Sequence, residues 1–530
     1  MRFLTVSLLL AALGMLANAQ TVKHVIVVIQ ENRTPDNLFG ADPALAAQGA
    51  NLWGTSNPAP CVVNGISQPT VLQPYALDAC FSPSHKHASW IQMYDQGKMD
   101  QACDVPVTNA TCASQLTFPS YTYVDNSKQL VTPYFNIAAN YGFANYMFQT
   151  NQGPSYPAHL FLFSGTSAPV DDDGDPNRYW QWFAGENPVD QQITGCVSPL
   201  GQVVEEIDPQ GKESEGYTPP YPPGAGPGFP CYSHNTLADL LDNAGVSWKY
   251  YASAAAYSLW TAPSSIASIC GTVVNGECTG DEFNTHVVAP SLPDQAPILT
   301  DIEKCNLAAV SWVIPDGRWS DHPGGVGDDG GPSWVATIVN AVGRSNAAGT
   351  TSCNYWSDTV ILIVWDDWGG WFDHVSPAAA AGGPGIGYPN QTGGQNVYGF
   401  RVPLLVVSAY AKPGYISGPA SNPDCSHGNY YCHDFGSILN FIEHTFNLGA
   451  SGINPAYPYA DTMAPDSPQV FPASPYSLAD FFGTEFHAFV PVTGAKYPPS
   501  CFFNQSVCWT NGASDPDDDA ADEQEPVGGR

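Results

Sequence analysis

The sequence predicts an α/β fold with a central, mostly parallel sheet flanked by helices and carrying long loop insertions. Four apolar runs have the length of buried strands, at residues 24–29, 307–314, 359–365 and 402–408. Continuous Val, Ile and Leu residues of this kind are typical of strands covered on both faces. Helical patterns alternate with them, at residues 235–244, 333–343 and 436–446. Asn235 is the expected N-cap of the first helix.

The domain organisation follows from the distribution of these elements. A length of 530 residues would allow two or more domains. No low-complexity linker interrupts residues 20–510, so we expect one domain over residues 20–512. Residues 171–230 and 376–396 are rich in Gly and Pro and are expected as loop insertions near the site. The acidic residues 513–530 are predicted to be a disordered tail.

Residues 1–19 have the pattern of a signal peptide. Arg2 provides the charged start, residues 4–16 the apolar core, and residues 17–19 a small-residue cleavage motif. The alternative reading, a membrane anchor, is weak because a spanning helix needs about 20 apolar residues. We therefore expect a secreted or periplasmic protein with no integral membrane contact.

The cysteine content fits an exported protein. All 14 cysteines follow the predicted cleavage site, and an even count in an exported chain favours disulfides. Neighbours in sequence are the expected partners: Cys103 with Cys112, Cys270 with Cys278, Cys425 with Cys432 and Cys501 with Cys508.

The charge balance is strongly acidic. Lys and Arg total 16 against 49 Asp and Glu, which gives a formal net charge of −33. This charge argues strongly against nonspecific nucleic-acid binding, because such proteins need positive charge to meet the phosphates. An anionic substrate would need local positive charge at its site.

Oxygen ligands follow two of the predicted strands. Glu31 and Asn32 come directly after the first strand, and Asp366 and Asp367 come after the strand at 359–365. Ligands in open α/β sheets sit at the carboxyl ends of strands. If the two strands are neighbours, these four side chains form a site for one divalent cation. The alternative for the first pair is a strand-to-helix turn with an Asn cap. The adjacent carboxylates repel each other unless a cation or proton compensates.

Ser155 lies in the segment Gly153-Pro154-Ser155-Tyr156-Pro157, where Pro157 suits the first turn of a helix. Backbone N–H groups and the positive end of the helix dipole at such a start favour a phosphoryl group. The alternative is that Ser155 is only an N-cap.

Histidines in loops supply candidate positive charge. They are His85, His286 and His322, with His374 following a double-Gly turn. An imidazolium binds phosphate and donates protons. A single histidine is more often structural. Several histidines that reach one carboxylate cluster are a stronger indication of a phosphate site.

Six ordered motifs carry a resemblance to a known family: ENRT, GPSYP, SDHP, WDDWGGWFDHV, YGFRVPLLVVSAYAKPGYIS and DFGSILNFIE. Over residues 23 to about 450 the chain resembles the bacterial phosphoesterase family. That family contains phosphatidylcholine-hydrolysing phospholipases C and AcpA-type acid phosphatases. The resemblance implies an alkaline-phosphatase-like fold.

The resemblance also implies roles for individual residues. One divalent metal ion is expected on Glu31, Asn32, Asp366 and Asp367, with Ser155 both touching the metal and acting as nucleophile. His85 matches a phosphate-binding histidine, and His322 matches the histidine of the acidic-His-Pro motif. His286 aligns with a third histidine of the site.

Two departures from the phospholipase C members favour the phosphatase-like branch. Those members carry Thr at the nucleophile position and Asn-Arg after the proline, where this chain has Ser155, Ala158 and His159. They also carry extra C-terminal domains, whereas little sequence follows residue 450 here. A sulfatase is disfavoured because its signature needs Arg at position 159.

The predicted function is that of a secreted, metal-dependent phosphoesterase. It would hydrolyse small phosphate monoesters through a phosphoserine intermediate, as an acid phosphatase does. The enzyme alternative is a phospholipase C that cleaves phospholipid headgroups. The remaining alternative is a secreted binding protein without catalysis.

Overall fold

The computed structural model describes residues 22–170, 182–207, 213–214, 224–253, 256–291, 294–325, 329–346, 353–377, 398–421, 425, 428–449, 451–456 and 459–509. The predicted signal peptide and the predicted acidic tail lie outside the described residues, as do parts of both predicted loop insertions.

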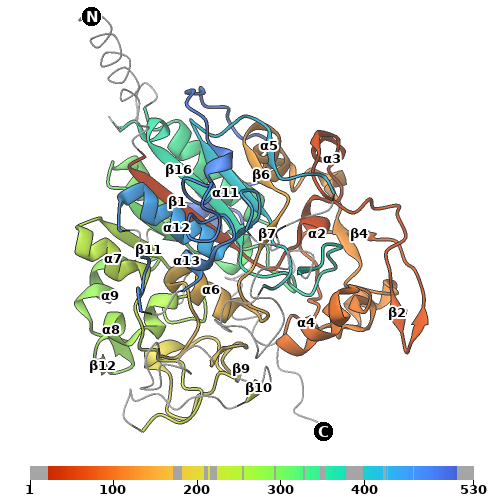
Figure 1. Cartoon of the computed structure of the whole chain (residues 1–530), viewed down its shortest axis with the longest axis horizontal. Helices are drawn as coiled ribbons and strands as arrows, with labels where there is room; N and C mark the ends of the chain where they lie inside the picture. Colours follow the sequence, from red (N-terminus) through yellow and green to blue (C-terminus); the bar gives the residue numbers. More distant parts are fainter. Residues whose placement is uncertain are drawn as a thin grey trace, which may run out of the picture.

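An eight-stranded sheet forms the centre of the molecule (Figure 1). Its order is β14 (Val287–Val288), β11 (Trp248–Tyr251), β15 (Val310–Val313), β1 (His24–Gln30), β16 (Thr359–Trp365), β17 (Leu404–Ser408), β6 (Gly142–Ala144) and β18 (Tyr415–Ser417). Only β17 runs antiparallel to its neighbours in this sheet. The four predicted strands and the mostly parallel sheet are therefore confirmed.

The register of β1 and β16 positions the site. All seven residues of β1 pair in parallel with all seven of β16, from His24 with Thr359 to Gln30 with Trp365. Both strands are almost wholly buried, as their apolar sequences require. The residues that follow the two strands therefore leave the sheet side by side at the same edge.

Helices cover both faces of the sheet. On one face, Phe163 of α6 (Ser155–Ser164) packs against Trp312 of β15, with ring centroids 5.2 Å apart. On the other face, Tyr134 of α5 (Thr132–Asn140) packs against Trp365 of β16 at 5.1 Å. Successive side chains of a strand point to opposite faces, and the paired registers place these two tryptophans three positions apart along the sheet.

The three predicted helices are present as α7 (Leu237–Ala244), α11 (Gly331–Gly343) and α12 (Phe435–Phe446). The predicted N-cap of α7 is wrong by one residue, because Thr236 takes the place expected for Asn235. The Thr236 hydroxyl accepts the N–H of Asp239, and the Asp239 carboxylate accepts the N–H of Thr236. This reciprocal pair satisfies two backbone donors, which an Asn235 cap would not do.

Seven disulfides join described residues: Cys61–Cys103, Cys80–Cys112, Cys196–Cys231, Cys270–Cys278, Cys305–Cys353, Cys425–Cys432 and Cys501–Cys508. Three of the four predicted pairs are confirmed, and Cys103–Cys112 is wrong. Backbone pairing explains the error. The N–H of Val62 donates to Asp100, which brings Cys61 to Cys103. A bridge between Pro83 and Val107 brings Cys80 towards Cys112.

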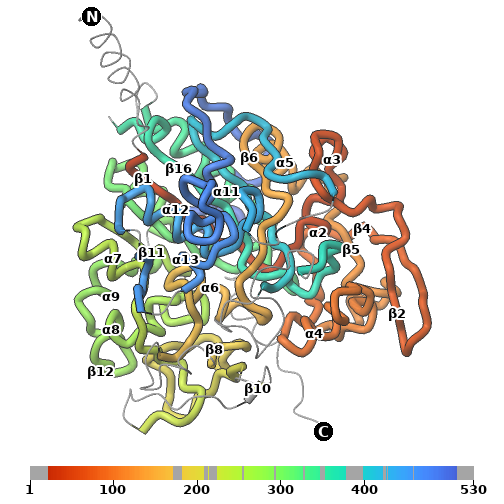
Figure 2. Tube along the Cα trace, in the orientation of Figure 1, coloured from red at the N-terminus to blue at the C-terminus, as the bar shows by residue number. Residues whose placement is uncertain are grey.

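These first two disulfides fasten the part of the chain that carries His85. Figure 2 shows β2 (Val62–Val63), β4 (Gln73–Tyr75), β5 (Thr122–Val124) and α4 (His87–Tyr94) along one side of the molecule. His85 lies two residues before the start of α4, so the two disulfides limit the movement of the segment that brings this histidine to the sheet.

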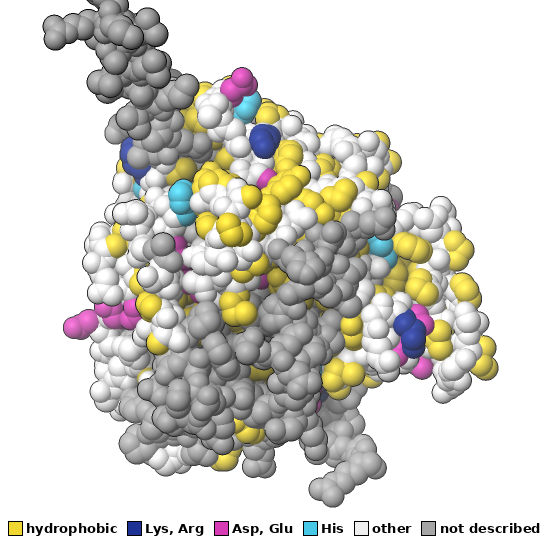
Figure 3. Space-filling model, in the orientation of Figure 1, with side chains coloured by type: hydrophobic (Ala, Val, Ile, Leu, Met, Phe, Trp, Pro, Cys, Tyr) yellow, Lys and Arg dark blue, Asp and Glu magenta, His cyan; other side chains and the backbone are white. Residues whose placement is uncertain are grey.

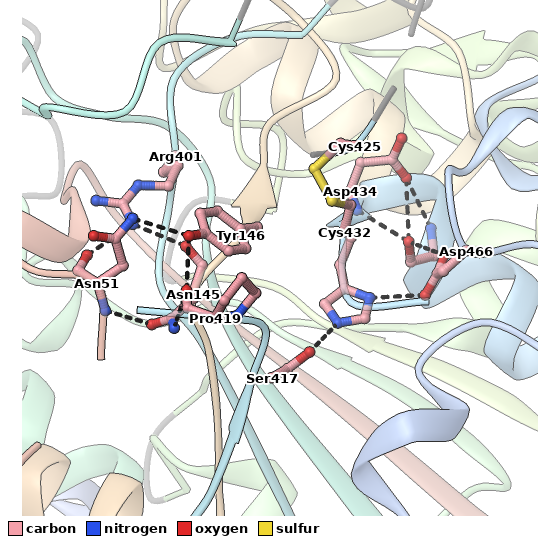
Figure 4. Close-up of a disulfide and its surroundings, with 12 residues drawn as sticks. Asn51, Asn145, Tyr146, Arg401, Ser417, Pro419, Cys425, Cys432, Asp434 and Asp466 are labelled. Atoms are coloured by element: carbon pink, nitrogen blue, oxygen red, sulfur yellow. Dashed lines mark hydrogen bonds and ion pairs between the residues drawn. A yellow bond between two sulfur atoms is a disulfide. The ribbon is translucent and has the colours of Figure 1, made fainter. Parts of the chain in front are cut away.

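A buried polar network lies beside the Cys425–Cys432 disulfide (Figure 4). His433 contacts Asp466 through Nδ1 at 2.8 Å and Ser417 through Nε2 at 2.9 Å. The arrangement of Ser417, His433 and Asp466 resembles a Ser-His-Asp triad. All three side chains are buried, however, and the Ser417 hydroxyl donates to Asp480. We therefore regard this network as structural.

Among the described residues, no helix has the length and apolar character needed to cross a bilayer.

Candidate active site

The carboxyl ends of β1 and β16 bring two pairs of predicted ligands together. Glu31 and Asn32 follow β1, and Asp366 and Asp367 follow β16. The backbone N–H of Asn32 donates to Oδ1 of Asp366 at 3.0 Å, which ties the two pairs to each other. Asn32 adopts a left-handed backbone conformation with φ of 57°. Non-Gly residues rarely take this conformation, and they cluster at functional sites when they do.

Ser155 is the first residue of α6 and points at this cluster. Its Oγ lies 3.2 Å from Oε2 of Glu31 and 3.1 Å from Oδ2 of Asp367. Pro154 precedes it as the N-cap residue, so Ser155 does not cap the helix. The alternative reading of Ser155 as an N-cap is therefore excluded.

The turn after Asp367 holds the pieces of the site against one another. Gly369 and Gly370 both have positive φ, at 63° and 71°. A Cβ added to Gly369 would lie 2.5 Å from the carbonyl oxygen of Asn32, and one added to Gly370 would lie 2.7 Å from the carbonyl oxygen of Ser84. The two glycines therefore allow the loop before His85 to approach the metal-ligand candidates.

Burial and mutual repulsion dominate the electrostatics of the three carboxyl groups. Burial, with the charges of Asp366 and Asp367, raises the pKa of Glu31 well above its usual value. Burial and the charge of Asp366 raise the pKa of Asp367 to about 8. Burial opposes ionisation of Asp366 as well, but its contacts with His159, Glu31 and Ser155 together outweigh burial and lower the pKa of Asp366. A group of buried carboxyl groups in this state needs a cation or bound protons.

The donor set fits a hard divalent cation. Oδ1 of Asn32 and Oδ2 of Asp366 are buried oxygens with no hydrogen-bond partner. Carboxylate and amide oxygens are the ligands that such cations prefer, and an unsatisfied buried oxygen is costly without one. The predicted residues could therefore hold a metal ion, with Glu31 and Asp367 beside the Ser155 hydroxyl.

His159 is a residue that the sequence reasoning missed. Its Nε2 lies 3.2 Å from Oε1 of Glu31 and 3.6 Å from Oδ2 of Asp366. Ligand atoms of these three residues lie within 4.8 Å of one another. The signal was present in the sequence, because Ser155 and His159 are four residues apart on a predicted helix and share one face.

Two of the predicted histidines reach the same region. Asn32 donates through Nδ2 to Nε2 of His85 at 3.3 Å, and Nδ1 of His85 donates to the carbonyl of Pro83 at 3.2 Å. The His322 ring lies 6.1 Å from the His85 ring, centroid to centroid. The structure therefore places both rings near the oxygen cluster.

His286 does not join them. Its ring stacks on Trp248, the first residue of β11, with centroids 4.1 Å apart. Trp248 pairs through Val310 with Val25, near the start of β1. Val25 precedes Glu31 by six residues, which corresponds to about 20 Å along a strand. His286 therefore lies at the opposite end of the sheet, and the structure does not support its predicted place in the site.

Known proteins resemble the chain over this same framework. The sequence profile described as "Phosphoesterase family" matches residues 22–449, which include every residue of the oxygen cluster. The chain belongs to the phosphoesterase family. The predicted resemblance is thereby confirmed.

Relatives of the chain include bacterial phospholipases C. The chain is 23% identical to a non-hemolytic phospholipase C of Pseudomonas aeruginosa over 83% of its own length and 56% of that protein. It is 25% identical to phospholipase C A of Mycobacterium tuberculosis over 74% of its own length and 68% of that protein. The chain thus spans little more than half of the Pseudomonas relative.

The similarity of the chain to a solved structure is weak. The solved structure of Ps i-CgsB in complex with k-i-k-neocarrahexaose covers 81% of this chain and is covered to 73%, at 7% identity and a TM-score of 0.33. The assignment to the α/β class therefore rests on the strand order and helices described above and not on this match.

Proposed function

We propose that this protein is a metal-dependent phosphoric ester hydrolase in which Ser155 is the nucleophile. The observation that carries the proposal is the position of the Ser155 hydroxyl, buried at the start of α6 and within 3.2 Å of both Glu31 and Asp367. The family membership and the phospholipase C relatives support the same class of enzyme.

A divalent cation on Glu31, Asn32, Asp366 and Asp367 would supply positive charge for the phosphoryl oxygens and for the Ser155 oxygen. The chain's own groups perform the proton transfers. Ser155 gives its proton to one of the two adjacent carboxylates as its oxygen forms a bond to phosphorus.

The leaving alcohol then departs as its bond to phosphorus breaks. It takes a proton from an imidazolium, for which His85 and His322 are the candidates. Water then attacks the phosphorus of the serine ester and gives a proton to the imidazole that the leaving alcohol left neutral. The bond from phosphorus to the Ser155 oxygen breaks, and Ser155 takes its proton back from the carboxyl group as the phosphate product is released. Removing the proton from Ser155 and giving one to the leaving group keeps the reaction balanced.

The proposed substrate is a phosphodiester of the phospholipid-headgroup type. The relatives named as phospholipases C support this choice over the monoester predicted from the sequence. Charge supports it too, because a diester carries one negative charge where a monoester carries up to two, and the chain carries −33. Lys and Arg side chains lie singly on the described part of the face in Figure 3.

A small phosphate monoester is the second candidate. The observation that favours it is Ser155 itself, with Ala158 and His159 after the proline where the phospholipase C pattern has Asn-Arg. We also propose that the protein works outside the cytosol, because its seven disulfides need an oxidising compartment.

Replacing Ser155 with alanine tests the proposal. Loss of a covalent nucleophile should reduce turnover by about 10³-fold or more. The matched control is Ser164→Ala, which removes a buried hydroxyl without a hydrogen-bond partner at the other end of the same helix. The control should retain turnover within a factor of about two, because removing a group that makes no specific contact usually has a small effect.

Three substrates separate the candidate functions: 4-nitrophenyl phosphate, 4-nitrophenyl phosphorylcholine and phosphatidylcholine vesicles, each with added divalent metal and with chelator. Preference for the two choline esters supports the diester, and preference for the first supports the monoester. Normal turnover by a folded Ser155→Ala variant would exclude the nucleophile assignment. No turnover of any substrate by wild type with metal would favour the non-catalytic alternative.

A further inference from the structure

Three metal-ligating side chains converge at the far end of the sheet. Asp242 lies on α7, and Glu282 and His286 lie on α9 (Asp281–His286). Ligand atoms of the three lie within 4.8 Å of one another. Figure 1 shows α7 and α9 next to each other beside β11, on the side of the molecule away from α4.

The orientation of His286 leaves one ring nitrogen for a ligand. Nδ1 lies 2.8 Å from the carbonyl oxygen of Trp248, so Nδ1 carries the proton and donates. In the neutral ring the lone pair is then on Nε2, which lies 3.5 Å from Oε2 of Glu282. Stacking on the Trp248 indole, with an interplanar angle of 10°, fixes the ring. Metal-binding histidines are held in this way, with the other nitrogen donating to a carbonyl or carboxylate.

Asp242 is also held in place, and Glu282 keeps one oxygen without a hydrogen bond. Trp248 donates through Nε1 to Oδ1 of Asp242 at 2.9 Å. Oε2 of Glu282 is a buried oxygen with no hydrogen-bond partner. Among the ion pairs of the described residues, none brings a Lys or Arg to either carboxylate.

We propose that Asp242, Glu282 and His286 bind one zinc ion, at a site separate from Ser155. One imidazole nitrogen with two carboxylates is a ligand set that zinc accepts, and water would complete four-fold coordination. The imidazole disfavours calcium and magnesium, which prefer oxygen ligands. Glu282 and His286 are four residues apart on one helix, the spacing that lets two side chains meet one ion.

The ion would link α7 to α9 across β11. Its role is structural, because the site lies about 20 Å along the strands from Glu31. Metal at this place accounts for a histidine that the reaction at Ser155 does not use. The proposal does not depend on the proposed function of Ser155.

The test measures zinc bound by the full chain. Wild type, Glu282→Gln and His286→Gln are stripped with chelator and dialysed against defined zinc concentrations, and bound zinc is counted by elemental analysis. The matched control is Glu303→Gln, which removes the same charge at an exposed position on α10 (Pro297–Glu303). Turnover of 4-nitrophenyl phosphate, with zinc supplied in excess, is measured in parallel.

We expect each site variant to bind one zinc ion fewer per chain than wild type, or to bind it at least about tenfold more weakly. Turnover should stay within a factor of about two, since the site is remote from Ser155. The His286→Gln variant could fail to fold, because His286 stacks on Trp248. The side chain of Glu282 is 44% exposed, so we expect the Glu282→Gln variant to fold and to keep the test decisive. Equal zinc content and affinity in wild type, Glu282→Gln and Glu303→Gln would overturn the proposal.

Discussion

Replacing Asp367 with asparagine should stabilise the metal-free protein while it removes activity. The side chains of Glu31 and Asp367 lie 3.2 and 3.1 Å from the same Ser155 hydroxyl. Their oxygens are therefore at most about 6 Å apart, and both side chains are buried. Two unit charges at about 6 Å repel by roughly 3 kcal/mol at an effective dielectric constant of about 20.

The amide removes this repulsion without changing the shape of the side chain. Its oxygen can still accept the N–H of Gly369, which donates to Oδ1 of Asp367 at 2.6 Å. Burial and the charge of Asp366 raise the pKa of Asp367 to about 8, so a bound proton already relieves part of the repulsion at neutral pH. We therefore expect the free energy of unfolding in chelator to rise by about 1–3 kcal/mol.

Urea unfolding followed by tryptophan fluorescence, in chelator and in saturating divalent metal, measures both effects. Metal should stabilise wild type more than the variant, because each lost carboxylate weakens a hard cation site. Turnover should fall by about 100-fold or more with metal present. The control is Asp358→Asn, which removes a surface partner of Lys23 and should change little. An Asp367→Asn variant that is less stable in chelator, yet equally stabilised by metal, would refute the reasoning.

Two further predictions concern His159 and Asp434. His159→Gln should lower kcat/KM for 4-nitrophenyl phosphate by about tenfold or more, because glutamine does not reproduce the ring that contacts Glu31 and Asp366; unchanged kinetics would exclude a role for His159. Burial and the charge of Asp466 raise the pKa of Asp434 to about 8. The folded protein therefore retains on Asp434 a proton that the unfolded chain releases near pH 4. Because of this difference, the stability of the folded protein should fall as pH rises from about 4 to 8. Asp434→Asn, whose oxygen can still cap α12, should flatten this fall in melting temperature and leave stability at pH 4 unchanged, and parallel curves for both proteins would contradict it.

The strands that position the site were predictable because burial on both faces leaves a continuous apolar run. Residues 359–365 show this directly, since the predicted range equals β16. The reversed direction of β17 was not predictable in the same way, because direction depends on the path of the intervening chain. The predictions of the N-cap of α7 and of the disulfide partner of Cys103 were wrong for a related reason. Both depend on hydrogen bonds, the Thr236–Asp239 pair and the Val62–Asp100 contact, that leave no trace in residue spacing alone.

The part of the site at the ends of neighbouring parallel strands was predictable from the sequence. Glu31 and Asp366 each follow a buried strand, and parallel pairing makes such positions neighbours. The structure does not support the prediction for His286, which ends α9. A histidine expected in a loop carries no information about which end of the sheet that segment reaches. His159 was missed for the opposite reason. It lies within an apolar helix, where a buried histidine is usually structural, and only the Ser155 spacing indicated the face it shares.

The side chains around Ser155 do not supply an excess of positive charge for a phosphate ligand. Arg33 follows the first ligand pair, but its guanidinium is buried and donates to the carbonyls of Leu77 and Asp321. It therefore stabilises the loop and does not meet the substrate. The histidines His85, His159 and His322 supply at most three positive charges, against three buried carboxyl groups. A bound cation would give the region the excess of positive charge that a phosphate needs, so we expect catalysis and substrate binding to be lost together when the metal is removed.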